Sequence, residues 1–425
     1  MTNVQRHLGW FAVMCLLLDW MLWVGVIKGL GFMLPTFKEQ FEVQTWLIGW
    51  MVAIVVGVIN FAGIFAGPLS SLIGTRAVVM MSGLMAGCSL ILSSFASGLP
   101  QITFLLAFGL GPGISCANIL CRVTIAQCFE SNYGTANGIA QAGSPLGLIV
   151  VAPLVQLFLD IYGWRGAFLL LGGITLHLVV CGALLRQPSI KKHNQESYRP
   201  VSSSEHGTCT EHEKPPAKNT LKETVLAVKS RFGFSICFRL SFWVITTIFV
   251  SNSMVDTFWC IYYVDHVVLK GFTANDAIVL STVAGVVKLF FKILVGVVVD
   301  KKVLKLRPAM AVLAIGCAIS LITDPWMKSY GLVLVNVAIY TSFAGALNSL
   351  TDVYARELLG TELLASAFSW MELINGVLIF VGGFLPGLIH DMTGSYDVAF
   401  IIMGCLFVPS LVALLVERYR PKREA

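Results

Sequence analysis

Long apolar stretches alternate with short polar links along this chain, and one long polar segment divides them into two sets of six. Each stretch has the roughly 20 residues with which an α-helix crosses the hydrocarbon layer of a membrane. The predicted spans are 9–34, 46–70, 77–97, 101–127, 134–160 and 165–185, then 237–263, 275–299, 308–325, 329–351, 365–389 and 396–416. The pattern predicts an all-α membrane protein with twelve transmembrane helices in two pseudo-symmetric six-helix bundles, an arrangement typical of transporters.

The polar segment between the two sets is too short and too rich in Ser, Lys and Pro to bury a core. We predict an N-terminal six-helix bundle over 1–185, a linker loop over 186–236, and a C-terminal six-helix bundle with a short tail over 237–425. The first apolar stretch is too long for a signal-peptide core, and no small-residue cleavage site follows it. We therefore expect it to be the first span.

Composition and charge support a membrane protein and set its orientation. Hydrophobic residues make up 56% of the chain and charged residues 12%, which excludes an ordinary soluble domain. The net charge of +6 comes from basic residues in the linker, in the link after the eighth span and in the tail. Because basic residues favour cytoplasmic loops, we predict that the linker and both termini are cytoplasmic. The lipid bilayer is the expected surrounding, and nucleic acid is not an expected partner.

The motifs of several function classes are absent from the sequence. It has no Walker A motif for ATP-driven transport, and no HExxH or GxSxG motif for an enzyme. The 11 cysteines form no CxxC pair, and no His/Cys cluster has the spacing of metal ligands. We expect no enzyme, no cofactor and no metal site.

Charged residues inside the predicted spans are the candidate functional residues. Each costs about 2.5–3.5 kcal/mol on insertion scales, so each needs a partner, water or a function. They are Asp19, Lys28, Arg122, Asp256, Lys288, Lys292 and Glu372. At 1.5 Å per residue, Asp19, Lys288 and Glu372 fall near the middle of the membrane.

Lys288 and Lys292 are four residues apart and share one face of a helix, where two cations repel each other unless an anion lies nearby. They predict a water-filled path that attracts an anionic substrate. The alternative for Lys292 is that it extends to the lipid headgroups. Arg122 is too deep for that, and Lys28 is either a gate residue at the outer end or an interfacial anchor.

The three acidic candidates have two alternative roles each. Asp19 either carries a proton or forms an ion pair between helices, and the same choice applies to Glu372. Asp256 fits the polar wall near the outer mouth, as a proton or ion-pair group. Gly138, Gly143 and Gly147 put small faces on the fifth span, where neighbouring helices pack closely and slide as the halves rock.

Residues 129–187 strongly resemble the fifth and sixth spans of the monocarboxylate porter family, within the major facilitator superfamily. The segments that carry the resemblance are ANG at 136–138, AGSPLG at 142–147, YGWRG at 162–166 and CGALLR at 181–186. The resemblance implies the major facilitator fold, transport of a small organic anion, and residence in the plasma membrane. Some relatives use a single-span glycoprotein chaperone, and the sequence leaves this need open.

The eighth span departs from the family pattern. Proton-coupled members carry an acid there and an Arg four residues later; the frame set by Gly296 and Asp300 puts Lys288 and Lys292 at those positions. The resemblance thus implies that Lys292 keeps the cation for the substrate anion, and that Lys288 reverses the sign of the acid. Lys28 falls near the lysine that such members use in the first span. Whether a proton travels with the substrate stays open.

Three hypotheses follow. The first is a porter for small organic anions, with monocarboxylates foremost, that works by alternating access with or without proton symport. The second is a pH-independent facilitative carrier of neutral or zwitterionic solutes, such as aromatic amino acids, creatine-like or carnitine-like compounds, or iodothyronines. The third is a membrane receptor that does not transport. Charges kept in the middle of the membrane argue against the third hypothesis, because their cost needs a function.

Overall fold

The fold is built from α-helices joined by short links. The computed structural model describes residues 3–42, 45–129, 132–185, 234–383 and 385–419, and over these ranges every regular element is helical. The predicted linker lies outside the described residues up to position 233. Continuous apolar runs favour helices here because a helix pairs its backbone groups within the segment, as the hydrocarbon layer requires.

The first bundle, called the N-terminal bundle below, contains α1 to α10. Its elements are α1 (Asn3–Phe41), α2 (Thr45–Ala62), η1 (Gly63–Phe65), α3 (Ala66–Ile73), α4 (Thr75–Ser93), α5 (Leu99–Leu105), η2 (Leu106–Leu110), α6 (Gly111–Cys128), α7 (Tyr133–Gln141), α8 (Gly143–Leu146), η3 (Gly147–Val151), α9 (Ala152–Thr175) and α10 (His177–Leu184). Several spans consist of consecutive elements, because a π-turn or a proline locally interrupts the regular helix.

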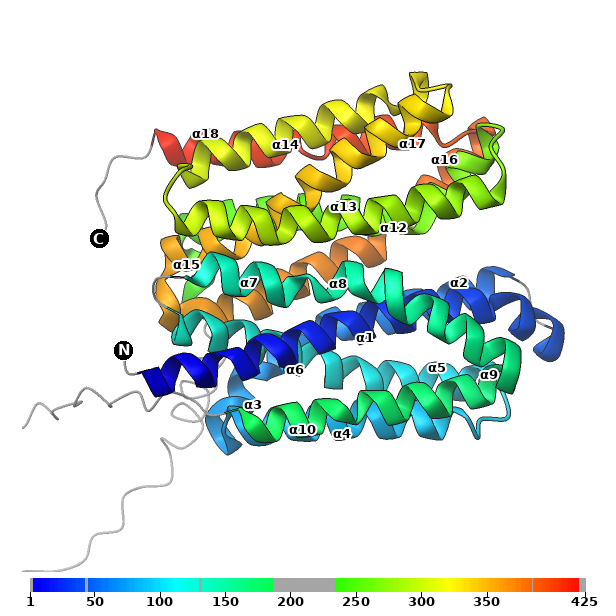
Figure 1. Cartoon of the computed structure of the whole chain (residues 1–425), viewed down its shortest axis with the longest axis horizontal. Helices are drawn as coiled ribbons and strands as arrows, with labels where there is room; N and C mark the ends of the chain where they lie inside the picture. Colours follow the sequence, from blue (N-terminus) through cyan, green and yellow to red (C-terminus); the bar gives the residue numbers. More distant parts are fainter. Residues whose placement is uncertain (1–2, 43–44, 130–131, 186–233, 384, 420–425) are drawn as a thin grey trace, which may run out of the picture.

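The second bundle, the C-terminal bundle, contains α12 to α18. Its elements are η4 (Phe234–Phe238), α12 (Leu240–Leu269), α13 (Ala274–Asp300), α14 (Leu306–Thr323), η5 (Asp324–Trp326), α15 (Tyr330–Gly382), α16 (Leu385–Thr393), α17 (Asp397–Cys405) and α18 (Val408–Arg418). Figure 1 shows the two bundles side by side, with the start of α1 and the end of α18 at the same end of the molecule. We call this the terminal end.

Ten stretches of the described residues are long and apolar enough to cross a membrane. Two of them are double length, at 52 and 64 residues, and each contains a glycine with non-helical backbone angles. Gly163 has φ 67° and Gly360 has φ 73°, conformations that residues with a Cβ adopt at a cost. Counting each double stretch as two crossings gives the twelve that the sequence predicts.

The second part of α15 fills the contact between the two bundles. It lies against α2, where a Cβ added to Gly376 would touch Asn60, and against η1, where Gly63 faces Glu372. The same segment also packs on α6. The second part of α15 therefore brings side chains of the C-terminal bundle against α2 and α6 of the N-terminal bundle, which is where the charged candidates meet.

Candidate functional site

Arg122 on α6 joins the two bundles through two carboxylates of α15. Its Nε donates to Asp352 Oδ2 at 3.2 Å, its Nη2 pairs with Asp352 Oδ1, and its Nη1 lies 3.1 Å from Glu372 Oε1. The Arg122 and Asp352 side chains are 3% and 1% exposed, so this network is buried. A buried guanidinium of this kind is stable only with such partners.

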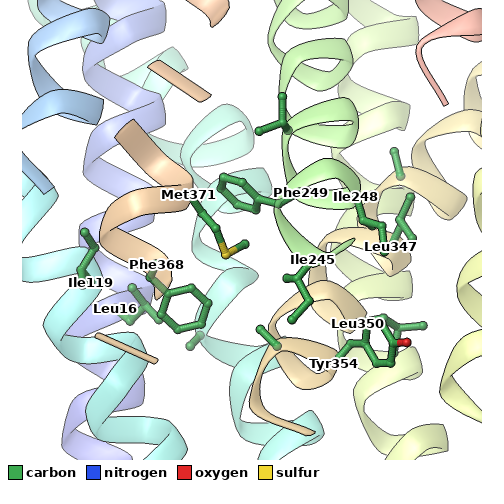
Figure 2. Packing of buried hydrophobic residues seen from close by; sticks show 14 of the residues in the cluster. Leu16, Ile119, Ile245, Ile248, Phe249, Leu347, Leu350, Tyr354, Phe368 and Met371 are labelled. Carbon is green, nitrogen blue, oxygen red and sulfur yellow. The ribbon is translucent and has the colours of Figure 1, made fainter. Parts of the chain in front are cut away.

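Aromatic rings surround the same guanidinium. The Arg122 Cζ atom lies 4.1 Å from the centroid of the Phe368 ring and 5.9 Å from that of Phe249, within the range of cation–π attraction. Figure 2 shows Phe249 of α12 beside Met371 of α15, with Phe368 one turn away on α15. The guanidinium of the N-terminal bundle is thus covered by aromatic side chains of the C-terminal bundle.

Lys292 on α13 reaches across to α7. Its Nζ donates to the carbonyl oxygen of Gln141 at 3.3 Å and lies 3.4 Å from Gln141 Oε1. Gln141 in turn donates from Nε2 to Asp352 Oδ2 at 2.5 Å, which links Lys292 to the Arg122 network. Lys292 is 3% exposed, and within the described ranges no carboxylate lies at ion-pairing distance from it.

Lys288, one turn before Lys292, points to a different partner. Its Nζ lies 2.5 and 2.8 Å from the two carboxylate oxygens of Asp256 on α12. The expected repulsion between the two lysines is therefore relieved by an acidic residue of another helix. Lys28 on α1 donates to the carbonyl oxygen of Cys260, also on α12, at 2.9 Å, so it connects the two bundles without a carboxylate.

Asp19 on α1 is fully buried, and its partner belongs to the same bundle. Asn118 Nδ2 on α6 donates to Asp19 Oδ2 at 3.0 Å. Asp19 Oδ1 has no hydrogen-bond partner in the part of the chain that the structure describes. Among the described residues, Asp19 therefore forms no ion pair with a cation of the other bundle, which was one of its two expected roles.

The three glycines of the fifth span meet two different helices. A Cβ added to Gly138 would lie 2.5 Å from the carbonyl oxygen of Lys292 on α13, in the other bundle. Cβ atoms added to Gly143 and Gly147 would instead strike the carbonyl oxygens of Leu17 and Met21 on α1, in the same bundle. Gly138 thus allows a contact between the bundles, and the other two allow packing within one.

A second polar contact joins the bundles nearer the terminal end. Asp300, the last residue of α13, accepts hydrogen bonds from the backbone nitrogens of Gly134 and Thr135 at 2.9 and 2.6 Å, and from Thr135 Oγ1 at 2.5 Å. These nitrogens belong to the first turn of α7, where amides lack partners in the helix and favour an anion. Asp300 thus closes the contact between α7 and α13 at this end.

Asp352 and Gln141 are the site residues that sequence reasoning missed. Asp352 lies one position beyond the predicted span 329–351, but the helix continues to Leu359, one residue before the turn at Gly360. A charged residue at the end of an apolar run is read as the end of the predicted span. Its depth in the membrane is therefore not recognised from the sequence. Gln141 carried no charge signal, and its proximity to Gly138 was the only available hint.

The site contains four cations and four carboxylates. They are Lys28, Arg122, Lys288 and Lys292, with Asp19, Asp256, Asp352 and Glu372. Across the described ranges, no group of three His, Cys, Asp or Glu side chains is arranged to hold a metal ion. The arrangement can bind, orient and neutralise a charged solute between two bundles.

Comparison with known proteins shows the family to which the chain is similar. The sequence model of the Major Facilitator Superfamily matches residues 9–343 and 269–425. Monocarboxylate transporter 12-B of Danio rerio is 30% identical over 372 residues, which cover 83% of this chain and 76% of that one. Monocarboxylate transporter 12 of Mus musculus is 26% identical over 418 residues, covering 96% and 84%.

A solved structure of the same fold extends the comparison to three dimensions. The proton:xylose symporter XylE bound to 6-bromo-6-deoxy-D-glucose superposes with a TM-score of 0.69 at 15% identity, covering 97% of this chain and 96% of that chain. At that identity the likeness shows the fold. Together with the sequence matches, it establishes a membrane transporter that is not an enzyme, and the chain belongs to the monocarboxylate transporter family of the major facilitator superfamily.

Proposed function

We propose that this transporter carries small organic anions, with monocarboxylates foremost, and that Lys292 neutralises the substrate carboxylate. The observation that carries the proposal is the environment of Lys292. It is a buried cation at the contact between the bundles, held by two oxygens of Gln141 and by no carboxylate at ion-pairing distance among the described residues. The names of the monocarboxylate transporters that it resembles support the same substrate class.

Electrostatics explains why such a position favours an anion. A charge buried without a counter-ion costs several kcal/mol, and an anion that enters recovers part of that cost. Lys288 and Arg122 already have carboxylate partners, so they gain less from an incoming anion. Lys292 is thus the strongest attractor for a carboxylate, and Lys28 and Lys288 contribute to the positive field along the path.

Alternating access supplies the transport cycle. In this fold the two bundles rock about a site near the middle of the membrane. The contacts of Asp300 with α7, of Arg122 with α15 and of Lys28 with Cys260 all join one bundle to the other, so each breaks or shifts when the bundles separate on its side. A substrate that bridges Lys292 and Gln141 would replace the direct hydrogen bond between these two residues.

The proposal covers transport with proton symport and transport without it. Asp19, one of whose oxygens has no partner among the described residues, can exchange a proton as it stands, whereas Glu372 is held by Arg122 and can do so only when that pair opens. Asp256 is held by Lys288 and gains a proton only when that pair opens. We further propose residence in the plasma membrane with both termini cytoplasmic, from the basic residues near the terminal end.

The balance of charges favours a second candidate function. Because four carboxylates match four cations, a site that keeps all eight charged has no net charge. Such a site suits a neutral or zwitterionic solute, which would be carried without dependence on pH. Lys292 would then act with Gln141 to hold the bundles in register.

Uptake measurements decide between these functions. Labelled lactate, pyruvate and a panel of amino acids and amines are offered to cells that express the wild type, Lys292→Gln or Lys305→Gln, at outside pH 6 and 7.5. Lys305 is exposed in the link after α13 and serves as the matched control. We expect carboxylate uptake that Lys292→Gln abolishes and Lys305→Gln preserves, at equal surface expression.

The other outcomes are equally clear. Uptake that rises at pH 6 indicates proton symport, and a flat profile indicates facilitated transport. Uptake of a neutral solute that is the same at pH 6 and 7.5 would favour the second function. No uptake of any solute in the panel, with normal surface labelling, would contradict both functions.

A further inference from the structure

A polar seam between α7 and the first part of α15 joins the two bundles toward the terminal end (Figure 1). Tyr133 and Asn137 are four residues apart on α7 and therefore share one face of that helix. Ser349 and Arg356 of α15 are their neighbours in the other bundle. We call these four residues the closing seam.

Two attractive contacts hold the closing seam together. Asn137 Nδ2 donates a hydrogen bond to the carbonyl oxygen of Ser349 at 3.3 Å. The Arg356 Cζ atom lies 4.6 Å from the centroid of the Tyr133 ring, within the range of cation–π attraction. Each contact joins one bundle to the other, so both are lost when the bundles separate at the terminal end.

The same seam buries three polar atoms without partners. Among the described residues, no hydrogen bond is formed by Tyr133 Oη, Asn137 Oδ1 or Ser349 Oγ. The exposed fractions of these residues are 3% or less, so bulk water does not reach the three atoms in this conformation. A buried polar atom without a partner raises the free energy of the conformation that buries it. The closed seam is therefore less stable than its packing alone would make it.

Separation of the bundles would remove this penalty. In this fold, the helix faces at the contact between the bundles become the walls of a water-filled cavity when one end opens. Because α7 belongs to the N-terminal bundle and α15 to the C-terminal one, opening of the terminal end exposes the three atoms to water. Water then supplies the hydrogen bonds that the closed seam lacks.

Unpartnered hydroxyls inside one bundle have no such effect. The hydroxyls of Tyr263 and Tyr340 also have no partner among the described residues. Both tyrosine rings lie against the Trp259 ring within the C-terminal bundle, at centroid distances of 4.4 and 5.5 Å. They stay buried when the bundles move as units, so they do not change the balance between the closed and the open conformation.

We propose that the unpaired atoms of Tyr133, Asn137 and Ser349 shift the solute-free transporter toward the conformation that is open at the terminal end. Each of them raises the ratio of open to closed molecules by at least about fivefold, the lower limit for a buried group left unpaired. The contacts of Asp300 and Arg122 oppose this shift. The empty site is thereby offered more often to the side on which the termini lie, whichever solute is carried.

Amide hydrogen exchange of the purified, solute-free full-length transporter in lipid nanodiscs tests the proposal. The backbone nitrogens of Gly134 and Thr135 donate to Asp300 across the contact, so their exchange reports how often the terminal end opens. Ser349→Ala removes an unpaired hydroxyl from the opposite helix. It should lower the ratio of open to closed molecules at least about fivefold, which appears as slower exchange. Tyr133→Phe should act in the same direction.

Tyr354→Phe is the matched control. Tyr354 is a buried tyrosine of α15, 1% exposed, whose hydroxyl accepts a hydrogen bond from Arg307 Nε at 3.1 Å within the C-terminal bundle. Its removal should lower the unfolding temperature and leave exchange at Gly134 and Thr135 unchanged. Tyr133→Phe loses no hydrogen bond of the closed conformation, so it should unfold at the same temperature as the wild type or at a higher one.

Two outcomes would overturn the proposal. Unchanged or faster exchange in both Ser349→Ala and Tyr133→Phe would mean that ordered water already pairs these atoms in the closed seam. The same slowing in Tyr354→Phe would mean that loss of any buried hydroxyl nearby has this effect. Neither measurement uses a solute, so the uptake experiment can fail while this inference stands, and the reverse also holds.

Discussion

Gly138 and Lys292 meet through their backbones, because a Cβ added to Gly138 would lie 2.5 Å from the carbonyl oxygen of Lys292. Gly134 and Gly296 repeat this contact one turn nearer the terminal end. The helix that carries the proposed substrate cation is thus positioned by direct backbone packing of α13 on α7. Only glycine permits that approach at these positions.

The first prediction concerns this contact. Gly138→Ala should lower uptake by roughly five- to 150-fold, because overpacking costs about 1–3 kcal/mol and here falls on the state in which α7 and α13 touch. Gly173→Ala is the matched control, since Gly173 is an exposed glycine of α9 with nothing within 4 Å of an added Cβ. It should keep uptake and gain about 0.5–1 kcal/mol of stability. Wild-type uptake by Gly138→Ala would show that the two helices do not need to meet this closely.

The second prediction is a double-mutant cycle at the central ion pair. Arg122→Gln leaves Asp352 buried with a charge and should lower stability by about 3–5 kcal/mol. Adding Asp352→Asn removes that charge and should restore part of the loss, with a coupling energy of about 0.5–3 kcal/mol. Thermal unfolding of the purified variants measures the cycle. Additive effects of the two substitutions would mean that the pair is not coupled.

The third prediction concerns the contact between Asp300, at the end of α13, and the first turn of α7. Asp300→Asn weakens charge-assisted hydrogen bonds worth about 1.5–3 kcal/mol, so amide hydrogen exchange at Gly134 and Thr135 should accelerate about tenfold or more. Thr135→Val, which removes only the hydroxyl donor, should have a smaller effect. Asp391→Asn provides the control, because that carboxylate is 81% exposed. Unchanged exchange in Asp300→Asn would mean that the bundles are held at this end by the glycine contacts alone.

The fourth prediction is a pH dependence at Asp276, which the predicted span 275–299 includes but which lies before the apolar stretch Val279–Asp300 of the structure. Asp276 forms a capping box with Thr273 at the start of α13, and hydrogen bonds from the Thr273 hydroxyl and backbone lower the pKa of its carboxyl. A lowered pKa in the folded state stabilises the protein at pH above the unfolded value of about 3.9. That contribution is lost as the pH falls through the folded pKa.

Comparing the wild type with Asp276→Asn tests the capping box. The difference in unfolding temperature should be constant from pH 7 to about 5 and should shrink below about pH 4 as the wild-type carboxylate gains its proton. A difference that stays constant down to pH 3 would mean that the ionised carboxylate contributes nothing. Thr273→Ala also removes the hydrogen bond that Thr273 Oγ1 accepts from the Asp276 backbone nitrogen, so its difference from the wild type should shrink only in part as the pH falls.

The membrane crossings were predictable because the hydrocarbon layer demands continuous apolar residues, and the breaks between them carry polar residues and glycine. The exact ends were not. The predicted span 329–351 stops before Asp352, although the helix runs on, because burial of that carboxylate depends on Arg122 of another bundle. Hydropathy treats each residue alone, so a charge neutralised by a distant partner is read as the end of a span.

The partners of the candidate residues show the same limit. Helical spacing correctly put Lys288 and Lys292 on neighbouring turns, but the pairing of Lys288 with Asp256 depends on how α12 lies against α13. The link from Asp19 to Asn118 likewise depends on α1 and α6. Sequence spacing specifies neighbours along a helix, and contacts between helices require the packed fold.

The separation of Arg122 from Asp352 also has a consequence for biosynthesis. The two residues are 230 positions apart, and both carboxylate partners of Arg122 lie on α15. At about 5–20 residues per second, a ribosome needs roughly 10–50 s to deliver them after Arg122 has been made. During that interval the nascent N-terminal bundle holds a guanidinium without its acids in the membrane. Until α15 is complete, water, lipid headgroups or the insertion machinery must solvate that charge. Once α15 is complete, its carboxylates take over this role.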